Sequence, residues 1–341
     1  MTARTSRGLL GRLLPVVGLF FAAPLVLEYL SGDVSATSPL PLLGFGMLNG
    51  CAAIAIREAV ARRGGGWWRT ALLGVVVGLV EEGLLDQSLF NPAAFGIAGW
   101  LGYGYVPVLG TSTVTTLFVL GVDAVCGVLV PITLVELLVP HARSRRWLGR
   151  PGLAVVVVLL ALGATSTRSI THTLDHFTAA PAQLLTVSVA ALALAALALL
   201  PAPRATPTPP EVAGRAAPRP RLVAIASLAA TSLFLTAVLF GAQLHLPVWA
   251  ATGLLLATAA LSVSAVLRWS RHGWNRAHRL AATSGTLITW SWFGLLRKSA
   301  DTPLHFGAQI VLVVLTLSLL AHLARPGTTA TPDAANPRSN A

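Results

Sequence analysis

Ten apolar segments, each long enough to cross a lipid bilayer, recur along this sequence of 341 residues. A membrane-spanning helix needs about 20 apolar residues, because the hydrocarbon core of a bilayer is about 30 Å thick. Only 11% of the residues are charged and the mean hydropathy is +0.73, values that exclude an ordinary soluble domain. The sequence therefore predicts an all-α, polytopic integral membrane protein with about ten transmembrane helices. The predicted spans are 10–30, 40–57, 70–90, 111–139, 152–170, 182–201, 222–243, 247–267, 280–296 and 306–323.

The basic residues lie in short clusters between these segments and predict the topology. If the N-terminus is cytoplasmic, 21 of the 24 Lys and Arg residues fall on the cytoplasmic side, and only Arg168, Arg297 and Lys298 fall outside. The positive-inside rule then places both termini in the cytoplasm. The predicted location is a bacterial cytoplasmic (inner) membrane, where the lipid bilayer is the partner of these arginines. The net charge of +12 does not indicate a nucleic-acid partner, because no basic patch is interleaved with aromatic residues.

A Pro-rich stretch, PAPRATPTPPEVAGRAAPRP, interrupts the chain between Pro201 and Pro220. Such a composition cannot pack a core, so we expect a cytoplasmic linker at 202–221. The linker would separate an N-terminal bundle of about six helices, 1–201, from a C-terminal bundle of about four, 222–324. The last residues, 325–341, are rich in Thr, Pro, Ala and Asn and predict a disordered tail.

The third segment carries carboxylates at the depth of the bilayer, in the stretch GVVVGLVEEGLLD. An ionised carboxylate facing lipid costs about 2.5–3.5 kcal/mol, so such groups usually face a partner, a cavity or an ion. Glu81 lies about 100° around the helix from Glu82. The glycines would let a neighbouring helix approach closely, with the acids pointing into the contact. Four residues at every fourth position share one helix face: Gly74, Gly78, Glu82 and Asp86.

The fourth segment brings another carboxylate, Asp123, to a similar depth near the midplane. Pro131 cannot donate a hydrogen bond to the carbonyl group of Gly127, and a freed carbonyl beside a carboxylate is a plausible cation ligand. The alternative is that these acids are protonated or hydrogen-bonded structural groups and that Asp86 lies at the outer interface. The predicted proton- or ion-binding residues are Glu81, Glu82, Asp86 and Asp123.

Two histidines follow the fifth segment, in the sequence THTLDH from 171 to 176. No Gly or Pro stops the helix between Ala164 and Ala180, so His172 and His176 would share a helix face at the spacing of two zinc ligands. One prediction is therefore a divalent metal ion held by His172 and His176 with Asp123, and the alternative is a solvated pair at the membrane surface. The sequence identifies no other cofactor.

In chain order, these elements resemble the intramembrane CAAX-protease and bacteriocin-processing family, whose motifs are EExxxR, FxxxH and HxxxN/D. Glu81 and Glu82 match the paired glutamates and His172 begins the third motif. The resemblance implies a hydrolase in which these three residues activate water, and it covers roughly residues 70 to 180. The sequence departs from the motifs at three positions: Asp86 for arginine, Val122 for the histidine that should follow Phe118, and His176 for the last Asn or Asp. As a whole, the Arg- and Ala-rich chain resembles polytopic membrane proteins of high-GC bacteria, which implies no activity.

The remaining polar residues of the spans are predicted to be structural. Glu28 and Glu136 lie near membrane edges and are expected to reach the interface or pair with arginine. The Thr and Ser residues of the ninth segment are expected to bond their own helix or a neighbour. The external stretch from Asn91 to Gly110 either lies in the interface or caps a cavity. Three functions remain: a proton- or cation-coupled transporter, an intramembrane hydrolase, and a structural or accessory membrane protein.

Overall fold

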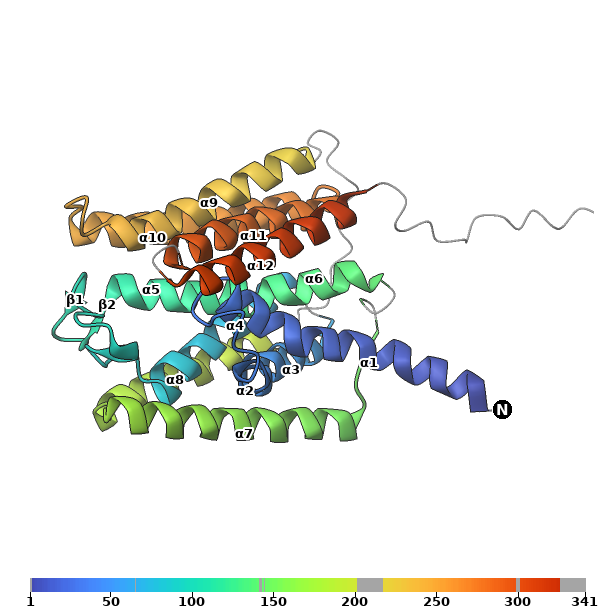
Figure 1. The fold of residues 1–341 in the computed structure, drawn as a ribbon, viewed down its shortest axis with the longest axis horizontal. Helices are drawn as coiled ribbons and strands as arrows, with labels where there is room; N and C mark the ends of the chain where they lie inside the picture. Colours follow the sequence, from blue (N-terminus) through green and yellow to red (C-terminus); the bar gives the residue numbers. More distant parts are fainter. Residues whose placement is uncertain are drawn as a thin grey trace, which may run out of the picture.

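The computed structural model describes residues 2–64, 66–140, 143, 145–200, 217–298 and 301–325, with side chains from residue 13 onward (Figure 1). The predicted tail beyond Arg325 and most of the predicted linker, 202–216, lie outside the described residues. Within them the chain is all-α apart from one pair of two-residue strands, and each predicted apolar segment coincides with a helical segment. In chain order the elements are α1 (Thr2–Pro24), η1 (Leu25–Tyr29), α2 (Pro41–Phe45), η2 (Gly46–Gly50), α3 (Cys51–Arg62), α4 (Trp67–Val80), η3 (Glu81–Leu85), η4 (Ala94–Gly96), β1 (Tyr105–Val106), β2 (Thr111–Ser112), α5 (Thr113–Val122), η5 (Asp123–Leu129), α6 (Val130–Leu138), α7 (Arg150–Asp175), α8 (Pro181–Leu199), α9 (Pro220–Phe240), α10 (Val248–Ser270), α11 (Arg276–Lys298) and α12 (Pro303–Ala324).

Seven helices of the described chain are long and apolar enough to cross a membrane. Five of them bury less than a fifth of their most apolar stretch, so their outer faces suit lipid. The other two are different, because 67% of the stretch in α2–η2–α3 and 61% of the stretch in α5–η5–α6 are buried inside the protein, and α5–η5–α6 is here named the central helix. The protein is thus a multi-pass membrane protein built around this central helix. The seven helices are α2–η2–α3, α5–η5–α6, α7, α8, α9, α10 and α12.

The other three predicted spans are shorter or more polar, and their crossing of the membrane stays a prediction. The apolar part of the first covers Leu13–Tyr29, the third carries Glu81 and Glu82, and α11 is rich in Thr and Ser. In Figure 1, α1 begins and α12 ends at one end of the bundle, here named the terminal end. The opposite end, with β1 and β2, is named the strand end. Both ends of the described chain thus lie at the terminal end, while the topology in the membrane stays a prediction.

The helices form two groups that share a core (Figure 1). α9 to α12 lie together above α5 and α6, and α1 to α4, α7 and α8 lie below. One apolar cluster joins α1, α3, α4 and α6 to α7 and α8, with Ile54, Leu73 and Val128 at its centre. A second joins η1 and α6 to the C-terminal helices through Leu30, Leu287 and Val313. The central helix contributes to both clusters.

Hydroxyl groups link α9 to α11, as predicted for the polar ninth segment. Thr231 Oγ1 and Thr289 Oγ1 are 2.7 Å apart, and Ser227 Oγ donates to the Ala282 carbonyl oxygen at 2.7 Å. Gly285 allows this close approach, because a Cβ atom there would lie 2.6 Å from the backbone nitrogen of Leu228. The structural interpretation of these residues is confirmed.

Gly74 and Gly78 face the central helix, which confirms their predicted role in close packing. A Cβ atom on Gly74 would lie 2.7 Å from the Cα atom of Ala124, and one on Gly78 would lie 2.8 Å from Asp123 Oδ2. Because real Cβ atoms essentially never make such short contacts, α4 can pack this closely against the central helix only with glycine at both positions. The glycines therefore bring the third segment against the carboxylate of the fourth.

Replacing Gly74 by Ala should destabilise the protein by about 1–3 kcal/mol, because the new methyl group meets backbone and not a flexible side chain. Thermal unfolding in detergent, followed by Trp fluorescence, would show a lower Tm. Gly253→Ala on α10 is the matched control, since its Cβ atom meets nothing within 4 Å. Equal Tm values for the two variants would contradict the packing argument.

Candidate functional site

Carboxylates from three helices meet in the middle of the N-terminal helices, beside an asparagine from a fourth. Glu81 of η3 and Asp123 of η5 line one narrow gap together with Asn49 of η2. All three side chains are more than nine-tenths buried. Glu28 of η1 joins them, because Asn49 Nδ2 donates a hydrogen bond to Glu28 Oε1 at 3.0 Å. The predicted convergence of the third and fourth segments is thus present, with two further helices involved.

Each of these polar residues lies in a π-helical turn. η1 contains Glu28, η2 contains Asn49, η3 begins with Glu81 and η5 begins with Asp123. π turns are rare and are frequently found at functional sites. Two of them adjoin prolines, Pro24 before η1 and Pro131 after η5, whose missing N–H groups disrupt the α-helical bonding. The irregularity predicted at Pro131 is therefore observed, as a widened turn.

Three oxygen atoms at this gap have no hydrogen-bond partner: Asn49 Oδ1, Glu81 Oε2 and Asp123 Oδ2. An unsatisfied buried polar atom costs about 1–3 kcal/mol, so native structures contain few of them. The gap itself is too narrow to admit a water molecule between these side chains. Three such atoms in one place define the candidate functional site.

Glu82 and Asp86 are close to the site but do not line the gap. Ser88 Oγ donates a hydrogen bond to Glu82 Oε2, and Thr171 Oγ1 of α7 donates to Asp86 Oδ1 at 2.9 Å. Glu82 and Asp86 were predicted to continue the face of Gly74 and Gly78, but Glu81 lines the gap with Asp123, and Asp86 bonds Thr171 of α7. A π turn takes about one residue more than an α turn, which rotates the following residue by about 100°.

The histidine pair does not have the predicted geometry. α7 ends at Asp175, and His176 has a left-handed conformation with φ of 51°, so the helix does not continue through the pair. His172 is exposed, and its Nδ1 atom lies 3.4 Å from the Phe177 carbonyl oxygen. The expectation of a shared helix face was therefore wrong, because the chain must turn here to enter α8.

Metal binding by His172, His176 and Asp123 gains no geometric support. In the described part of the chain, no group of three or more His, Cys, Asp or Glu side chains could hold a metal ion. Nor does any hydrogen bond or ion pair between described residues join His172 to Glu81 or Glu82. The metal site and the hydrolase remain predictions from the sequence.

Two residues of the site were missed or misassigned from the sequence. Glu28 was expected to reach the interface or pair with arginine, but it bonds Asn49 inside the protein. Asn49 received no role, although a lone amide within an apolar segment is itself a signal of a buried polar contact. Glu136 does pair with arginine as predicted, 3.5 Å from Arg57 and 3.7 Å from Arg279.

A second polar cluster lies near the terminal end and is held together by ion pairs. Glu58 is completely buried, 3.0 Å from both Arg57 Nη1 and Arg62 Nη2, and its Oε1 atom accepts from the Trp147 backbone N–H. Arg57 also donates to the carbonyl oxygen of Arg145. Arg57 and Arg62 thus serve in folding as well as in topology, and this cluster is structural.

Glu58→Ala should destabilise the protein by about 3–5 kcal/mol, because it removes the buried anion that Arg57 and Arg62 share. Chemical unfolding in mixed micelles would measure the loss. As a control, Asp301→Asn removes an exposed pair with Lys298 and should change nothing measurable. Unchanged stability of the Glu58 variant would refute the structural assignment.

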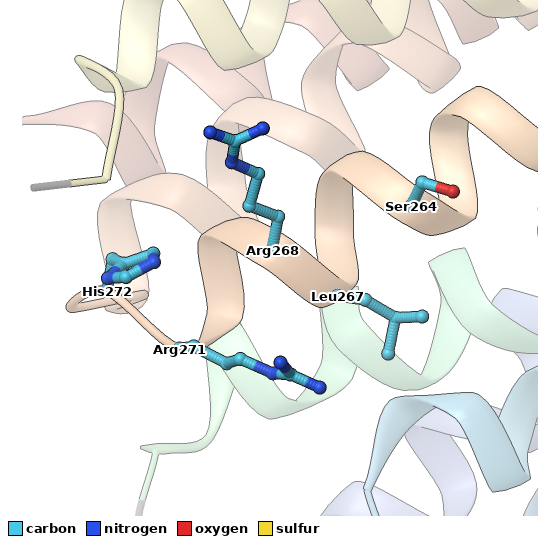
Figure 2. A pocket seen from close by; sticks show the side chains of 5 residues that line it. All are labelled: Ser264, Leu267, Arg268, Arg271 and His272. Carbon is cyan, nitrogen blue, oxygen red and sulfur yellow. The ribbon is translucent and has the colours of Figure 1, made fainter. Parts of the chain in front are cut away.

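A hollow at the end of α10 is less suited to chemistry (Figure 2). It is open, it is lined by one helix and the residues just after it, and Arg268 and Arg271 extend in different directions. It contains no carboxylate, so the acidic gap remains the candidate site. Its lining residues are Ser264, Leu267, Arg268, Arg271 and His272.

Comparison of the chain with models of protein families, with curated proteins and with solved structures finds no match. The resemblance to the CAAX-protease family therefore rests on the motif residues alone. The function has to be argued from the geometry of the site.

Proposed function

We propose that this protein is a proton-coupled transporter whose titratable site is the gap between η1, η2, η3 and η5. The proposal is carried by three deeply buried oxygen atoms that line one gap without a partner, Asn49 Oδ1, Glu81 Oε2 and Asp123 Oδ2. The cluster around Glu58 differs in chemistry, because that carboxylate is ion-paired with Arg57 and Arg62, whereas no ion pair between described residues neutralises Glu81 or Asp123. A site that binds and releases a ligand needs oxygen atoms that no permanent partner occupies.

A proton fits this gap better than a metal cation. Two carboxylates this close and away from water cannot both carry a charge at low cost, so a proton held by Glu81 or Asp123 stabilises the pair. A proton needs no cavity, whereas a cation needs room that the gap does not offer. The same proton would supply a donor for one of the partnerless oxygen atoms.

The backbone around the site also favours transport. Irregular helices in the middle of a membrane protein are tolerated where protein covers them, and they mark many transport sites. The C-terminal helices reach the same region, because Trp290 Nε1 donates to the Leu27 carbonyl oxygen at 3.4 Å and Gln309 Nε2 to that of Leu30 at 2.9 Å. These bonds lie on either side of Glu28, so a movement of α11 or α12 would be transmitted to the site.

Among the C-terminal helices, α11 is tied firmly to α9. Hydroxyl groups join the two helices at Thr231 and Thr289, and Gly285 lets their backbones approach closely. The apolar cluster around Leu30 and Leu287 connects this pair to η1. Because α11 and α12 bond the backbone on either side of Glu28, their movement provides a means of coupling the C-terminal helices to protonation at the site.

The proton site can be tested with a hydrophobic fluorescent carbodiimide, which adds to protonated carboxyl groups in apolar surroundings to give an N-acylurea. We expect modification of Glu81 or Asp123 in the reconstituted protein, located by peptide mass spectrometry. The rate should fall by up to ~10-fold per pH unit once the site deprotonates. Glu81→Gln combined with Asp123→Asn should abolish this labelling, while the control Asp301→Asn should retain it.

Coupling is tested in proteoliposomes that contain a pH-sensitive dye. A solute that the protein carries should move protons when its gradient is imposed on wild type, and not with Glu81→Gln. Labelling that persists in the Glu81 and Asp123 double variant, or none at any pH, would reject the proton site.

A further inference from the structure

Polar side chains continue from the acidic gap toward one end of the bundle. Beyond Glu81, the half-buried Glu82 is bonded by Ser88, and Asp86 is bonded by Thr171. One step further, Asn91 Nδ2 donates to Asp175 Oδ2 at 2.9 Å. The series leads to the strand end. This series can conduct protons to a site only if the gap binds a proton. A proton-transfer role for these side chains therefore rests on the proposed function.

No such series leads from the gap to the terminal end within the described chain. On α3, Cys51 and Ile54 lie in sequence between Asn49 and the buried ion pairs. Leu73 of α4 belongs to the same apolar cluster. On the central helix, Val128 and Ile132 come after Asp123. These residues form one packed apolar cluster. The carboxylates beyond it, Glu58 and Glu136, are held by arginines.

The charged groups around Glu82 and Asp86 are consistent with a relay. Asp175 and Arg168 of α7 lie within electrostatic range of Asp86, and Asp33, which lies just after η1, lies within electrostatic range of Glu82. From the inner side, both Asp123 and Glu28 lie within electrostatic range of Glu82 and Asp86. α8 packs on η3 through Val187 and contains no titratable residue. Acidic side chains thus extend from the buried gap to the surface. One basic side chain, Arg168, lies near Asp86, the carboxylate at the outer end of this segment.

We infer that the acidic gap exchanges its proton with the strand end only, through Glu82 and Asp86, and that the apolar cluster around Ile54 and Val128 seals it from the terminal end. In this conformation the proton enters at Asp175 and Asn91, where α7 meets the chain just after η3. Asp86 and its partner Thr171 are positioning and relay residues, and the gap itself holds the proton.

Sealed vesicles that contain the full chain in one orientation test this inference. The lumen is strongly buffered, the pH is changed on one face at a time between pH 5 and 9, and the rate of carbodiimide labelling at Glu81 and Asp123 is measured. Acidifying the strand-end face by one unit should raise the rate by up to ~10-fold, and acidifying the other face should leave it unchanged. A protease site added at the C-terminus reports the orientation.

Two variants test the relay, Asp86→Asn and the milder Thr171→Val, which keeps the carboxylate. Both should slow the response to strand-end pH while labelling at equilibrium still reaches the wild-type extent. Asp301→Asn, an exposed acid in the loop that joins α11 to α12, is the matched control and should respond normally.

The outcomes separate the two proposals. Labelling that responds to the terminal-end face, to both faces equally or to neither would overturn the inference while leaving the proton site in place. Normal kinetics in both relay variants would also overturn the assigned path. Absence of labelling at every pH would reject the proton site and the inference together.

Discussion

The cost of keeping carboxylates away from water governs the arrangement of this protein. Glu81 and Asp123 lie at the level of the apolar core, where a lipid-facing charge would be expensive, and the fold brings them together inside the bundle. Gly74 and Gly78 make this possible, because any side chain there would hold α4 away from the central helix. The central helix is consequently well enclosed, while the outer helices present their apolar faces to lipid.

The protein treats its buried charges in two different ways. Near the terminal end, Glu58 and Glu136 are paired with arginines in a network that also binds backbone carbonyl groups. In the gap, oxygen atoms of Asn49, Glu81 and Asp123 lack partners. The carboxylates of the gap therefore differ from Glu58 and Glu136 in that no ion pair with a described base neutralises them. This contrast underlies the assignment of structure to one cluster and function to the other.

The positions of the helical segments could be predicted from residue order alone, because a run of about 20 apolar residues is a local signal that lipid enforces. The similar depth of Glu81 and Asp123 was predictable for a related reason, since depth along a helix depends directly on residue count. The pairing of Glu136 with arginine and the packing role of the hydroxyls in the ninth segment were also predicted correctly. Each of these roles is the usual one for its residue type.

Packing between helices decides which polar side chains come into contact. The bond between Asn49 and Glu28 joins residues 21 positions apart on different helices, and no local pattern encodes it. The π turn at η3 rotates Asp86 toward Thr171, which a uniform helical period cannot predict. The end of α7 at Asp175 depends on how the chain packs as it enters α8. Partners far apart in sequence, and turns that depart from 3.6 residues, are set by contacts between helices and not by the order of residues within them.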